Sequence, residues 1–262
     1  MVDARRPLAG RSVLVTRPEG RSSALIERLR GLGADVEARP TIALEAPSDA
    51  APARRAVRRL DEMDWILFTS ANGVQFFISR LREAGKKTSE IRSGIAAIGP
   101  GTAERLAACG LEADLVARDS RSEGFAEALR DRVAPGQRVL VVAPEVTRPV
   151  LVDALNDLGT ESEAVAFYRN VAAPGVDEVV DQVCRGRYDV IVFTAPSTLH
   201  RLLEGGWCSR SQLVRALGRT AIVAIGGVTA RAVEEEGLRT AAVAASPTDD
   251  GIVEAVTGLF RA

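Results

Sequence analysis

A short apolar strand, a glycine turn and the start of a helix occur twice in this sequence, at residues 95–106 and 221–233. In each copy an apolar run of strand length leads directly into a helical pattern. Glycine permits a tight turn and a close approach of the backbone to a ligand, and Thr102 and Thr229 fall in the first helical turn beside unpaired N–H donors. Helix starts of this kind attract anions. Any strand-to-helix loop of a parallel sheet looks similar, so one copy alone does not define a ligand site.

The spacing between these two copies recurs along the whole chain. The repeated pieces are residues 13–15 and 139–141, 68–69 and 193–194, 99 and 226, and 124 and 251, with offsets of 126, 125, 127 and 127 residues. A repeat of this length is a domain-sized unit and not the period of roughly 20–50 residues found in solenoids. We therefore interpret the chain as an internal duplication of one α/β unit. The order of the pieces allows either two sequential domains or two domains that exchange their pieces.

Short apolar runs alternate with amphipathic helical segments throughout. Strands are expected at 12–16, 35–39, 65–68, 95–98, 113–117, 139–142, 163–168 and 221–225, and a basic helix at 53–60. This alternation is typical of parallel sheets with helices on both faces, so the predicted fold class is α/β. The Pro-containing stretch 45–52 is expected to be an exposed loop at a domain crossing. Ligands of such sheets bind beyond the carboxyl ends of the strands, and two facing sheets would form a cleft.

The composition excludes several classes of function. Lys+Arg 34 against Asp+Glu 35 leaves a net charge of −1, so no basic field favours nucleic acid or an anionic membrane. No run of about 18 apolar residues is present, and the first residues lack an apolar segment, so neither a membrane span nor a signal peptide is expected. Three widely spaced cysteines without a Cys-x-x-Cys pair fit a reducing cytoplasm. With His200 as the single histidine, no metal site is expected.

Polar residues and glycines follow the expected strands. The candidate binding residues are Arg17, Thr69, Ser70, Asn72, Gly73, Gly99, Thr102, Thr194, Ser197, Gly226, Thr229, Pro247 and Thr248. Hydroxyl groups and backbone N–H groups dominate this set. The serines and threonines are equally suited to capping helices, and Arg17 is equally suited to a solvated surface. The glycine spacing matches neither a dinucleotide fingerprint nor a Walker loop, so no nucleotide cofactor is expected.

Two tyrosines lie at opposite ends of expected strands. Tyr168 closes the strand 163–168, so its phenol either projects beyond the carboxyl end of the sheet or packs on the linker as a rim residue. Tyr188 precedes the strand that begins at Asp189 and is placed on the opposite rim. His200 is expected on an exposed helix face.

Seven stretches, taken in order, resemble the uroporphyrinogen-III synthase family over essentially the whole chain. They are residues 13–18, 68–74, 97–103, 167–169, 193–197, 224–230 and 246–248. Three positions depart from the family pattern. Pro144-Glu145 stands where an Arg-Gly pair is usual, Ala195 where serine is common, and Gly227-Val228 where Pro-Thr is usual.

The resemblance implies two flavodoxin-like lobes joined by a two-stranded linker. Carried onto this chain, lobe one comprises residues 1–40 plus 173–262, and lobe two comprises residues 41–172. The linker strands are then expected near Pro40 and Tyr168. By resemblance alone, this favours the arrangement in which the domains exchange their pieces.

The resemblance also implies an activity. Members of the family cyclise hydroxymethylbilane to uroporphyrinogen III, with inversion of ring D and loss of water, in haem and corrin biosynthesis. The substrate supplies its own nucleophile, so the enzyme chiefly has to position it, and N–H donors and hydroxyls at helix starts suit the substrate carboxylates. Tyr168 is the expected proton donor to the leaving hydroxyl. We expect a lyase that acts as a monomer in the cytoplasm without cofactor, metal, nucleic acid or membrane.

Two other functions fit part of the pattern. A non-catalytic two-lobed binder or sensor of an anionic small molecule or tetrapyrrole would have the same fold and loops. A sugar-phosphate enzyme would need a phosphate loop or a clear general base, and the sequence contains neither.

Overall fold

The chain is described by a computed structural model over residues 6–17 and 23–261. Its contacts divide into two compact units. Unit 1 comprises Met1–Ala43 and Val171–Ala262, and unit 2 comprises Leu44–Asn170. The chain passes from unit 1 to unit 2 within strand β3 (Ile42–Glu45) and returns within strand β8 (Glu161–Ala172).

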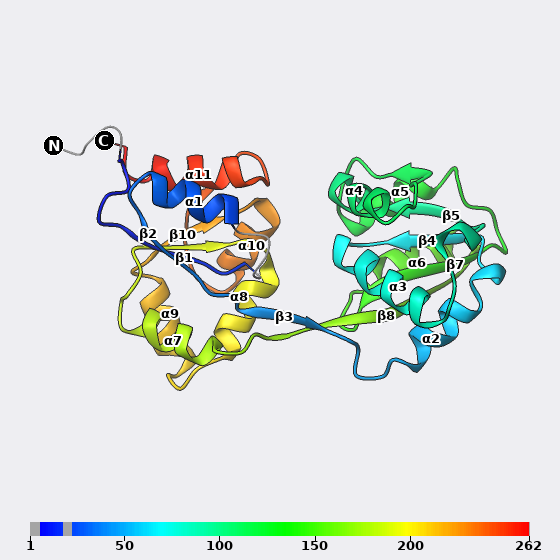
Figure 1. The fold of residues 1–262 in the computed structure, drawn as a ribbon, viewed down its shortest axis with the longest axis horizontal. Coiled ribbons are helices and arrows are strands. Elements are labelled where there is room, and N and C mark those ends of the chain that lie inside the picture. Colours follow the sequence, from blue (N-terminus) through cyan, green and yellow to red (C-terminus); the bar gives the residue numbers. More distant parts are fainter. Residues whose placement is uncertain (1–5, 18–22, 262) are drawn as a thin grey trace. The chain divides into compact units, whose positions relative to one another are not determined.

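The sheet of unit 1 takes its strands from both ends of the chain (Figure 1). Its strands are β1 (Ser12–Val15), β2 (Asp35–Ala38), β9 (Val190–Phe193), β10 (Ala221–Ala224) and β11 (Thr240–Val243). They are ordered β2-β1-β9-β10-β11, and each neighbouring pair is parallel. Numbered along the chain this is the order 2-1-3-4-5, which is the flavodoxin-like order.

Helices cover both faces of this sheet (Figure 1). They are α1 (Ser23–Gly31), α7 (Val176–Cys184), α8 (Pro196–Glu204), α9 (Arg210–Leu217), α10 (Gly227–Glu235) and α11 (Asp249–Gly258). The core between the sheet and α1 and α11 includes Leu25, Leu29 and Ile252. Helices α7 to α10 pack on the opposite face around residues such as Ile191 and Leu202. All four residues of β9 are buried, because this strand is central and covered on both faces.

The sheet of unit 2 is built in the same way. Its strands are β4 (Trp65–Phe68), β5 (Gly94–Ala97), β6 (Leu115–Val116) and β7 (Arg138–Pro144), together with β8 and the edge strand β3. The order is β3-β8-β7-β4-β5-β6. Every pair from β8 to β6 is parallel.

Helices again form a layer on each side of the sheet. They are α2 (Ala51–Arg58), α3 (Ala71–Glu83), α4 (Pro100–Ala108), α5 (Ser122–Leu129) and α6 (Val150–Asp157), with single 3-10 turns at Leu60–Glu62 and Thr88–Glu90. Helices α2, α3 and α4 share one core with Phe68 and Phe77. Helices α5 and α6 bury Phe125 and Leu155 on the other face. The expected α/β class with parallel sheets between helices is therefore confirmed.

Strands related by the sequence offset occupy the same place in the two sheets. The offset relates β1 to β7 and β9 to β4, and these are the neighbouring central strands of unit 1 and unit 2, respectively. Moving outwards, β2 corresponds to β8, β10 to β5 and β11 to β6. Each unit thus combines the first two strands of one repeat with the last three of the other. The sequence offsets left two arrangements open. The strand order is that of two domains that exchange their pieces.

A carboxylate at the amino edge of each sheet fixes the start of its neighbouring strand. Asp189 accepts hydrogen bonds from the backbone N–H and hydroxyl of Ser12, both at 2.8 Å. Asp64 accepts a bond of 2.8 Å from the backbone N–H of Arg138 in the same way. Asp189 directly precedes β9, and Asp64 directly precedes the corresponding strand β4. The two units therefore set the register of their central strands in the same way.

Several expected boundaries shift for physical reasons. The strand expected at 163–168 extends to Ala172, because it pairs with β3 at the sheet edge. The strand expected at 12–16 ends at Val15, and the hydroxyl of Thr16 donates instead to the carbonyl of Val192. The strand expected at 113–117 is reduced to the two residues of β6. Pro18 of the first family stretch lies outside the described residues.

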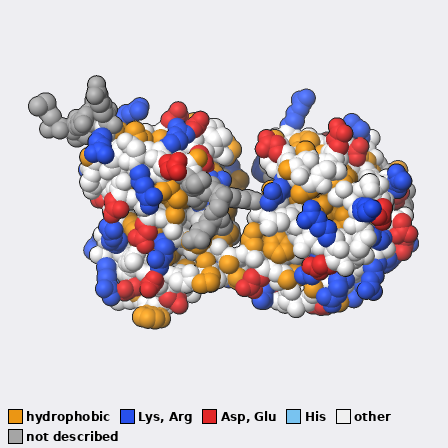
Figure 2. All heavy atoms as spheres, viewed as in Figure 1, with side chains coloured by type: hydrophobic (Ala, Val, Ile, Leu, Met, Phe, Trp, Pro, Cys, Tyr) orange, Lys and Arg blue, Asp and Glu red, His pale blue; other side chains and the backbone are white. Residues whose placement is uncertain are grey.

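The surface carries no large region of one charge on the face seen in Figure 2, where acidic and basic side chains are interspersed over each unit. This agrees with the net charge of −1. Within residues 6–17 and 23–261, no helix combines the length and apolar character needed to cross a membrane.

Candidate active site

The loop after β4 brings together two residues expected to act in the same site. Ser70 caps helix α3, since its hydroxyl oxygen accepts the backbone N–H of Gly73 at 2.9 Å. The same oxygen lies 2.9 Å from the phenol oxygen of Tyr168. These residues are 98 positions apart in the sequence, and they meet because Tyr168 lies in β8 level with Pro144 at the end of β7, which neighbours the end of β4. The result is a partly buried pair of hydroxyl groups beside a helix start.

The environment of Tyr168 keeps its phenol protonated. Only 4% of the residue is exposed, and its ring stacks on Phe76 with the ring centroids 5.5 Å apart. Burial raises the pKa of Tyr168 above its ordinary value of 10.0, while the hydrogen bond with Ser70 works in the opposite direction. The phenol therefore carries its proton throughout the neutral range and is available as a hydrogen-bond donor.

Two other candidates of this loop have structural contacts. The hydroxyl of Thr69 donates to the carbonyl of Val142 at 3.0 Å, so it ties the end of β4 to β7. A Cβ atom on Gly73 would lie 3.2 Å from Val142 and 3.4 Å from the Ser70 hydroxyl. Glycine at position 73 therefore leaves room for the Ser70 hydroxyl that caps α3.

The two repeated glycine turns have matching geometry. Gly99 and Gly226 are the N-caps of α4 and α10, and Thr102 and Thr229 follow at the third helical position. Neither glycine uses the freedom to turn that the sequence analysis attributed to it, because the φ angles of −178° and −179° are extended and open to any residue. At position 99 there is no room for a side chain, because a Cβ atom would lie 2.4 Å from the Ser120 hydroxyl.

The hydroxyls of Thr102 and Thr229 form no hydrogen bond with another described residue. The residues are 6% and 3% exposed, respectively, so the side chains pack against their own units. Neither hydroxyl makes a hydrogen bond within the described part of the chain, and neither is among the buried side-chain atoms without a partner, so both reach the surface. They lie beside first-turn N–H groups, which have no intrahelical partner.

In the loop after β9, the side chains of Thr194 and Ser197 form no hydrogen bond with another described residue. Ala195 occupies the N-cap of α8, so no side-chain hydroxyl caps this helix. The hydroxyl of Thr198 donates to the carbonyl of Ala195 at 2.7 Å. Thr194 and Ser197 are half-buried and form no side-chain hydrogen bond with another described residue. The same holds for Asn72 in unit 2.

Arg17 forms an ion pair. Its guanidinium lies 2.6 Å from the carboxylate of Asp249 in the first turn of α11, and the two side chains are 23% and 29% exposed. Thr248 caps this helix by accepting the N–H of Gly251 at 3.2 Å, and Pro247 before it is exposed. Arg17 is therefore held against the start of α11, and its charge is partly neutralised.

One departure from the family pattern has a clear structural role. The carboxylate of Glu145 accepts the backbone N–H of Ser48 at 2.9 Å and its hydroxyl at 3.2 Å. The backbone N–H of Glu145 donates to the carbonyl of Tyr168 at 2.8 Å. Glu145 thus joins the end of β7 to β8 and to the loop after β3, next to the phenol and hydroxyl pair.

Sequence reasoning missed three residues that shape these loops. Phe76 stacks on Tyr168, and its position one turn after Asn72 on the same helix face was the available signal. Asp249 pairs with Arg17 across 232 positions, so no local pattern indicates it. Thr198 is the third residue of α8, as Gly73 is of α3. The 125-residue offset between the two helices could have indicated this correspondence.

The rest of the predicted chemistry is found away from these loops. Tyr188 is buried at the amino edge of unit 1, where its phenol donates to Glu37 at 2.8 Å. His200 is exposed on α8, with its Nε2 atom 4.0 Å from Glu236. Among the residues that the structure describes, no group of three or more His, Cys, Asp or Glu side chains is arranged to hold a metal ion.

Comparisons with known proteins agree with this architecture. The family model described as uroporphyrinogen-III synthase HemD matches residues 23–254. The uroporphyrinogen-III synthase of Synechococcus elongatus is 29% identical, and the match covers 97% of this chain and 97% of that protein.

Solved structures share the fold at lower identity. A mutant uroporphyrinogen III synthase from Thermus thermophilus has a TM-score of 0.73 at 23% identity, covering 95% of this chain and 98% of that one. The uroporphyrinogen-III synthetase of Helicobacter pylori has a TM-score of 0.62 at 15% identity, covering 95% and 99%. Because the family match extends over most of its length, the chain belongs to the uroporphyrinogen-III synthase family, whose members are lyases.

Proposed function

We propose that this protein converts hydroxymethylbilane into uroporphyrinogen III, with loss of water and inversion of ring D. The observation that carries the proposal is the contact between the Tyr168 phenol and the Ser70 hydroxyl at the carboxyl edge of unit 2. Family membership supplies the reaction, and this contact supplies a protonated acid next to a helix start.

The proton donor is Tyr168. When Ser70 donates its hydroxyl proton to the phenol oxygen, the phenol O–H is free to donate to the leaving hydroxyl of the substrate. Ser70 can do this because its own oxygen is held by the N–H of Gly73. The raised pKa of Tyr168 keeps the proton in place until charge develops on the leaving group. Ser70 is thus a positioning residue for Tyr168.

The nucleophile is a pyrrole carbon of the substrate. The protein has to hold the chain folded so that the substituted carbon of the last ring is attacked, which leads to a spiro intermediate and to ring inversion. No metal or organic cofactor is needed for these steps.

The substrate carboxylates are bound at the helix starts that follow the strands. We assign this role to Arg17, Thr69, Ser70, Asn72, Gly73, Gly99, Thr102, Thr194, Ser197, Gly226, Thr229, Pro247 and Thr248. The unused hydroxyls of Thr102, Thr194, Ser197 and Thr229 support the assignment most strongly. Unpaired N–H groups and helix dipoles hold anions without a large protein charge. This suits a chain with nearly equal numbers of acidic and basic residues.

Two broader proposals accompany this function. The two lobes are residues 1–40 plus 173–262 and residues 41–172, which is supported by a contact division within β3 and β8. The protein acts as a monomer in a reducing cytoplasm without a nucleic-acid partner, which is supported by three free cysteines and a net charge of −1.

The test is turnover of freshly generated hydroxymethylbilane, with the type III and type I products separated. We expect type III product at a rate well above spontaneous closure, which gives type I. Spontaneous closure alone, combined with tight binding of a tetrapyrrole, would instead identify a non-catalytic binder, an alternative that the family comparisons do not favour.

A further inference from the structure

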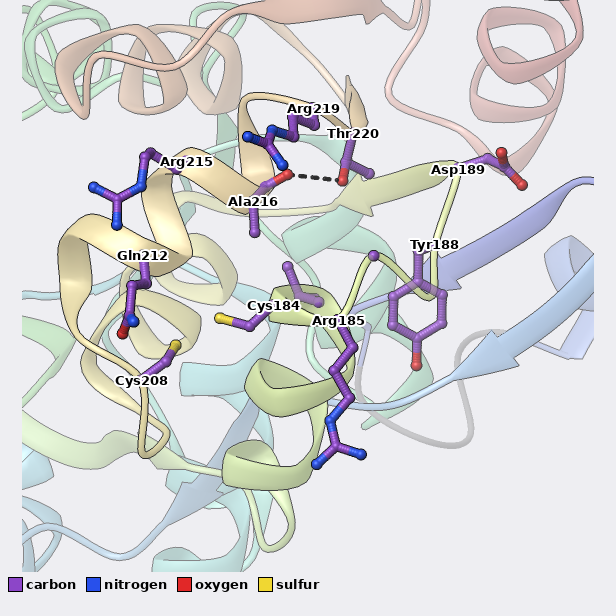
Figure 3. A pocket seen from close by; sticks show the side chains of 12 residues that line it. Cys184, Arg185, Tyr188, Asp189, Cys208, Gln212, Arg215, Ala216, Arg219 and Thr220 are labelled. Atoms are coloured by element: carbon purple, nitrogen blue, oxygen red, sulfur yellow. Dashed lines mark hydrogen bonds between the residues drawn. The ribbon is translucent and has the colours of Figure 1, made fainter.

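Two of the three cysteines line one cavity at the amino edge of unit 1, away from the loops described above. The cavity has a volume of about 580 Å³ and lies between the end of α7 and helix α9. Cys184 is the last residue of α7, and Cys208 lies in the loop before α9. Figure 3 shows the two sulfur atoms turned towards each other from these separate elements, and both residues pack against the same core cluster of unit 1.

The loop that carries Cys208 is fixed along one face of α7. The backbone N–H of Gly206 donates to the carboxylate of Asp177 at 2.5 Å. A Cβ atom on Gly206 would lie 2.2 Å from Val180, and the φ angle of +93° also favours glycine there. Asp177, Val180 and Cys184 follow one another on the same helix face. The loop therefore runs beside α7 and places Cys208 at Cys184.

The other side of the loop is fixed as well. Ser209 caps α9, because its hydroxyl accepts the N–H of Gln212 while the Gln212 side chain accepts the N–H of Ser209. Cys208 is thus held between an anchored glycine and an anchored helix start. The anchored backbone on either side of Cys208 keeps this residue beside the end of α7.

From this geometry we infer that Cys184 and Cys208 form a dithiol site that a peroxide oxidises to an intramolecular disulfide. The thiolate of Cys208 attacks one peroxide oxygen, the O–O bond breaks, and Cys208 becomes a sulfenic acid. Cys184 then attacks the sulfur of Cys208, the S–O bond breaks, and the Cys184 proton leaves with the hydroxide as water. Two thiols and one peroxide give one disulfide and two waters when the peroxide is hydrogen peroxide.

The order of the two steps follows from the environment of Cys184. Burial, with a smaller contribution from the neighbouring Cys208 thiol, raises the pKa of the Cys184 thiol to about 12. We assign the first attack to Cys208, because it follows the exposed Trp207 in the loop. Both residues are only half-buried, so a small oxidant has access to the pair.

The experiment treats the full chain with hydrogen peroxide and compares the wild type with C184S, C208S and C109S. Cys109 ends α4 in unit 2, which makes C109S the matched control. In the wild type we expect the three free thiols to fall to one, with loss of two hydrogen atoms in the intact mass. Peptide mapping should show the Cys184–Cys208 link, in C109S as in the wild type, and dithiothreitol should reverse it.

The single variants test the mechanism. In C184S, Cys208 should accumulate as a sulfenic acid that dimedone traps, and in C208S the remaining Cys184 should react at least tenfold more slowly. The emission of Trp207, which precedes Cys208 and is 91% exposed, gives a second readout of the closure. Oxidation of the two cysteines without a link between them, or a link to Cys109 or to a second chain, would overturn the inference. None of these outcomes depends on the synthase activity.

Discussion

The two units differ at the loops that follow the corresponding strands β4 and β9. In unit 2, Ser70 caps α3 and contacts Tyr168, so every hydroxyl in this loop is engaged by the protein. In unit 1, Ala195 stands at the corresponding N-cap, and Thr194 and Ser197 have unused side chains. The strand order around the two loops is the same.

The difference separates two tasks that one scaffold performs. In the proposed function, the loop of unit 2 positions the Tyr168 proton and holds it with Ser70 and the N–H of Gly73. The loop of unit 1 leaves its donors free, which suits the binding of carboxylates. We propose that the loop of unit 2 adds a chemical role to binding, whereas the equivalent loop of unit 1 only binds.

The largest effect is expected for Tyr168→Phe. The change keeps the ring and its stacking on Phe76 but removes the proton donor, so turnover should fall by roughly 10²–10⁴-fold. Product affinity and thermal stability should change little. The matched control is Tyr188→Phe in unit 1, which alters the other tyrosine of the chain and should leave turnover unchanged.

Rates are measured with fresh hydroxymethylbilane, and the products are separated by isomer. Normal formation of the type III product by Tyr168→Phe would show that Tyr168 is a rim residue.

A smaller effect is expected for Thr229→Val. This variant nearly preserves the shape of a side chain that is 3% exposed and removes a hydroxyl that no described residue uses. Binding of uroporphyrinogen should weaken by about 1–3 kcal/mol. The counterpart Thr102→Val in unit 2 should have an effect of the same sign. Equilibrium binding of both variants tests the assignment, and wild-type affinity in each would remove these threonines from the site.

The contrast between the two N-caps can be tested by exchanging them. Ser70→Ala removes the cap of α3 and the partner of Tyr168, so the free energy of unfolding should fall by about 0.5–2 kcal/mol. Turnover should fall by up to about tenfold, because one hydrogen bond to the acid is lost.

The reverse change, Ala195→Ser, adds a cap to α8 in unit 1 and should stabilise the protein without slowing turnover. Urea unfolding and steady-state kinetics measure both variants. Equal losses of turnover in Ser70→Ala and Ala195→Ser would contradict the proposed difference in role between the two loops.

The smallest effect concerns the carboxylates at the amino edges. Hydrogen bonds from Ser12 lower the pKa of Asp189 below its ordinary 3.8, so its stabilising contribution is present above that pH and is lost as the pH falls through the depressed pKa. Asp189→Asn should therefore lower stability at pH 7 by about 1 kcal/mol, a discounted figure because the side chain is 39% exposed.

The difference from wild type should close as the solution is acidified below the ordinary carboxyl pKa. Urea unfolding of the wild type and Asp189→Asn at several pH values checks this. If the difference in unfolding free energy between Asp189→Asn and the wild type stayed the same in acid, the charge of the Asp189 carboxylate would not be its cause.

Local patterns predicted the framework well, because the short apolar runs are the buried central strands. The run Trp65–Phe68 is a strand with the expected bounds, and its last three residues are fully buried. The end of β8 was missed because its extension depends on pairing with β3, which is more than 100 residues away in the chain. Edge pairing leaves no periodic signal in the strand itself.

The candidate site was predicted only as a set of loops. The rule that ligands bind beyond the carboxyl ends of parallel strands indicated which residues to consider. It could not show that Arg17 is paired with Asp249 or that Ser70 contacts Tyr168, because these partners are distant in sequence. Hydrogen-bond partners depend on the folded geometry, and so the free and engaged hydroxyls could not be told apart beforehand.

The exchange of strands between the repeats sets an order for folding during synthesis. Unit 2 is one continuous segment, so all of its strands have been synthesised before the C-terminal third of the chain exists. Strand β1 has to wait for β9, since Val13 pairs with Val190. Until then the N-terminal strands expose an unpaired edge, which is a hazard for aggregation. A unit 2 that folds first removes most of the intervening chain from the random coil, and this lowers the entropic barrier to closing unit 1.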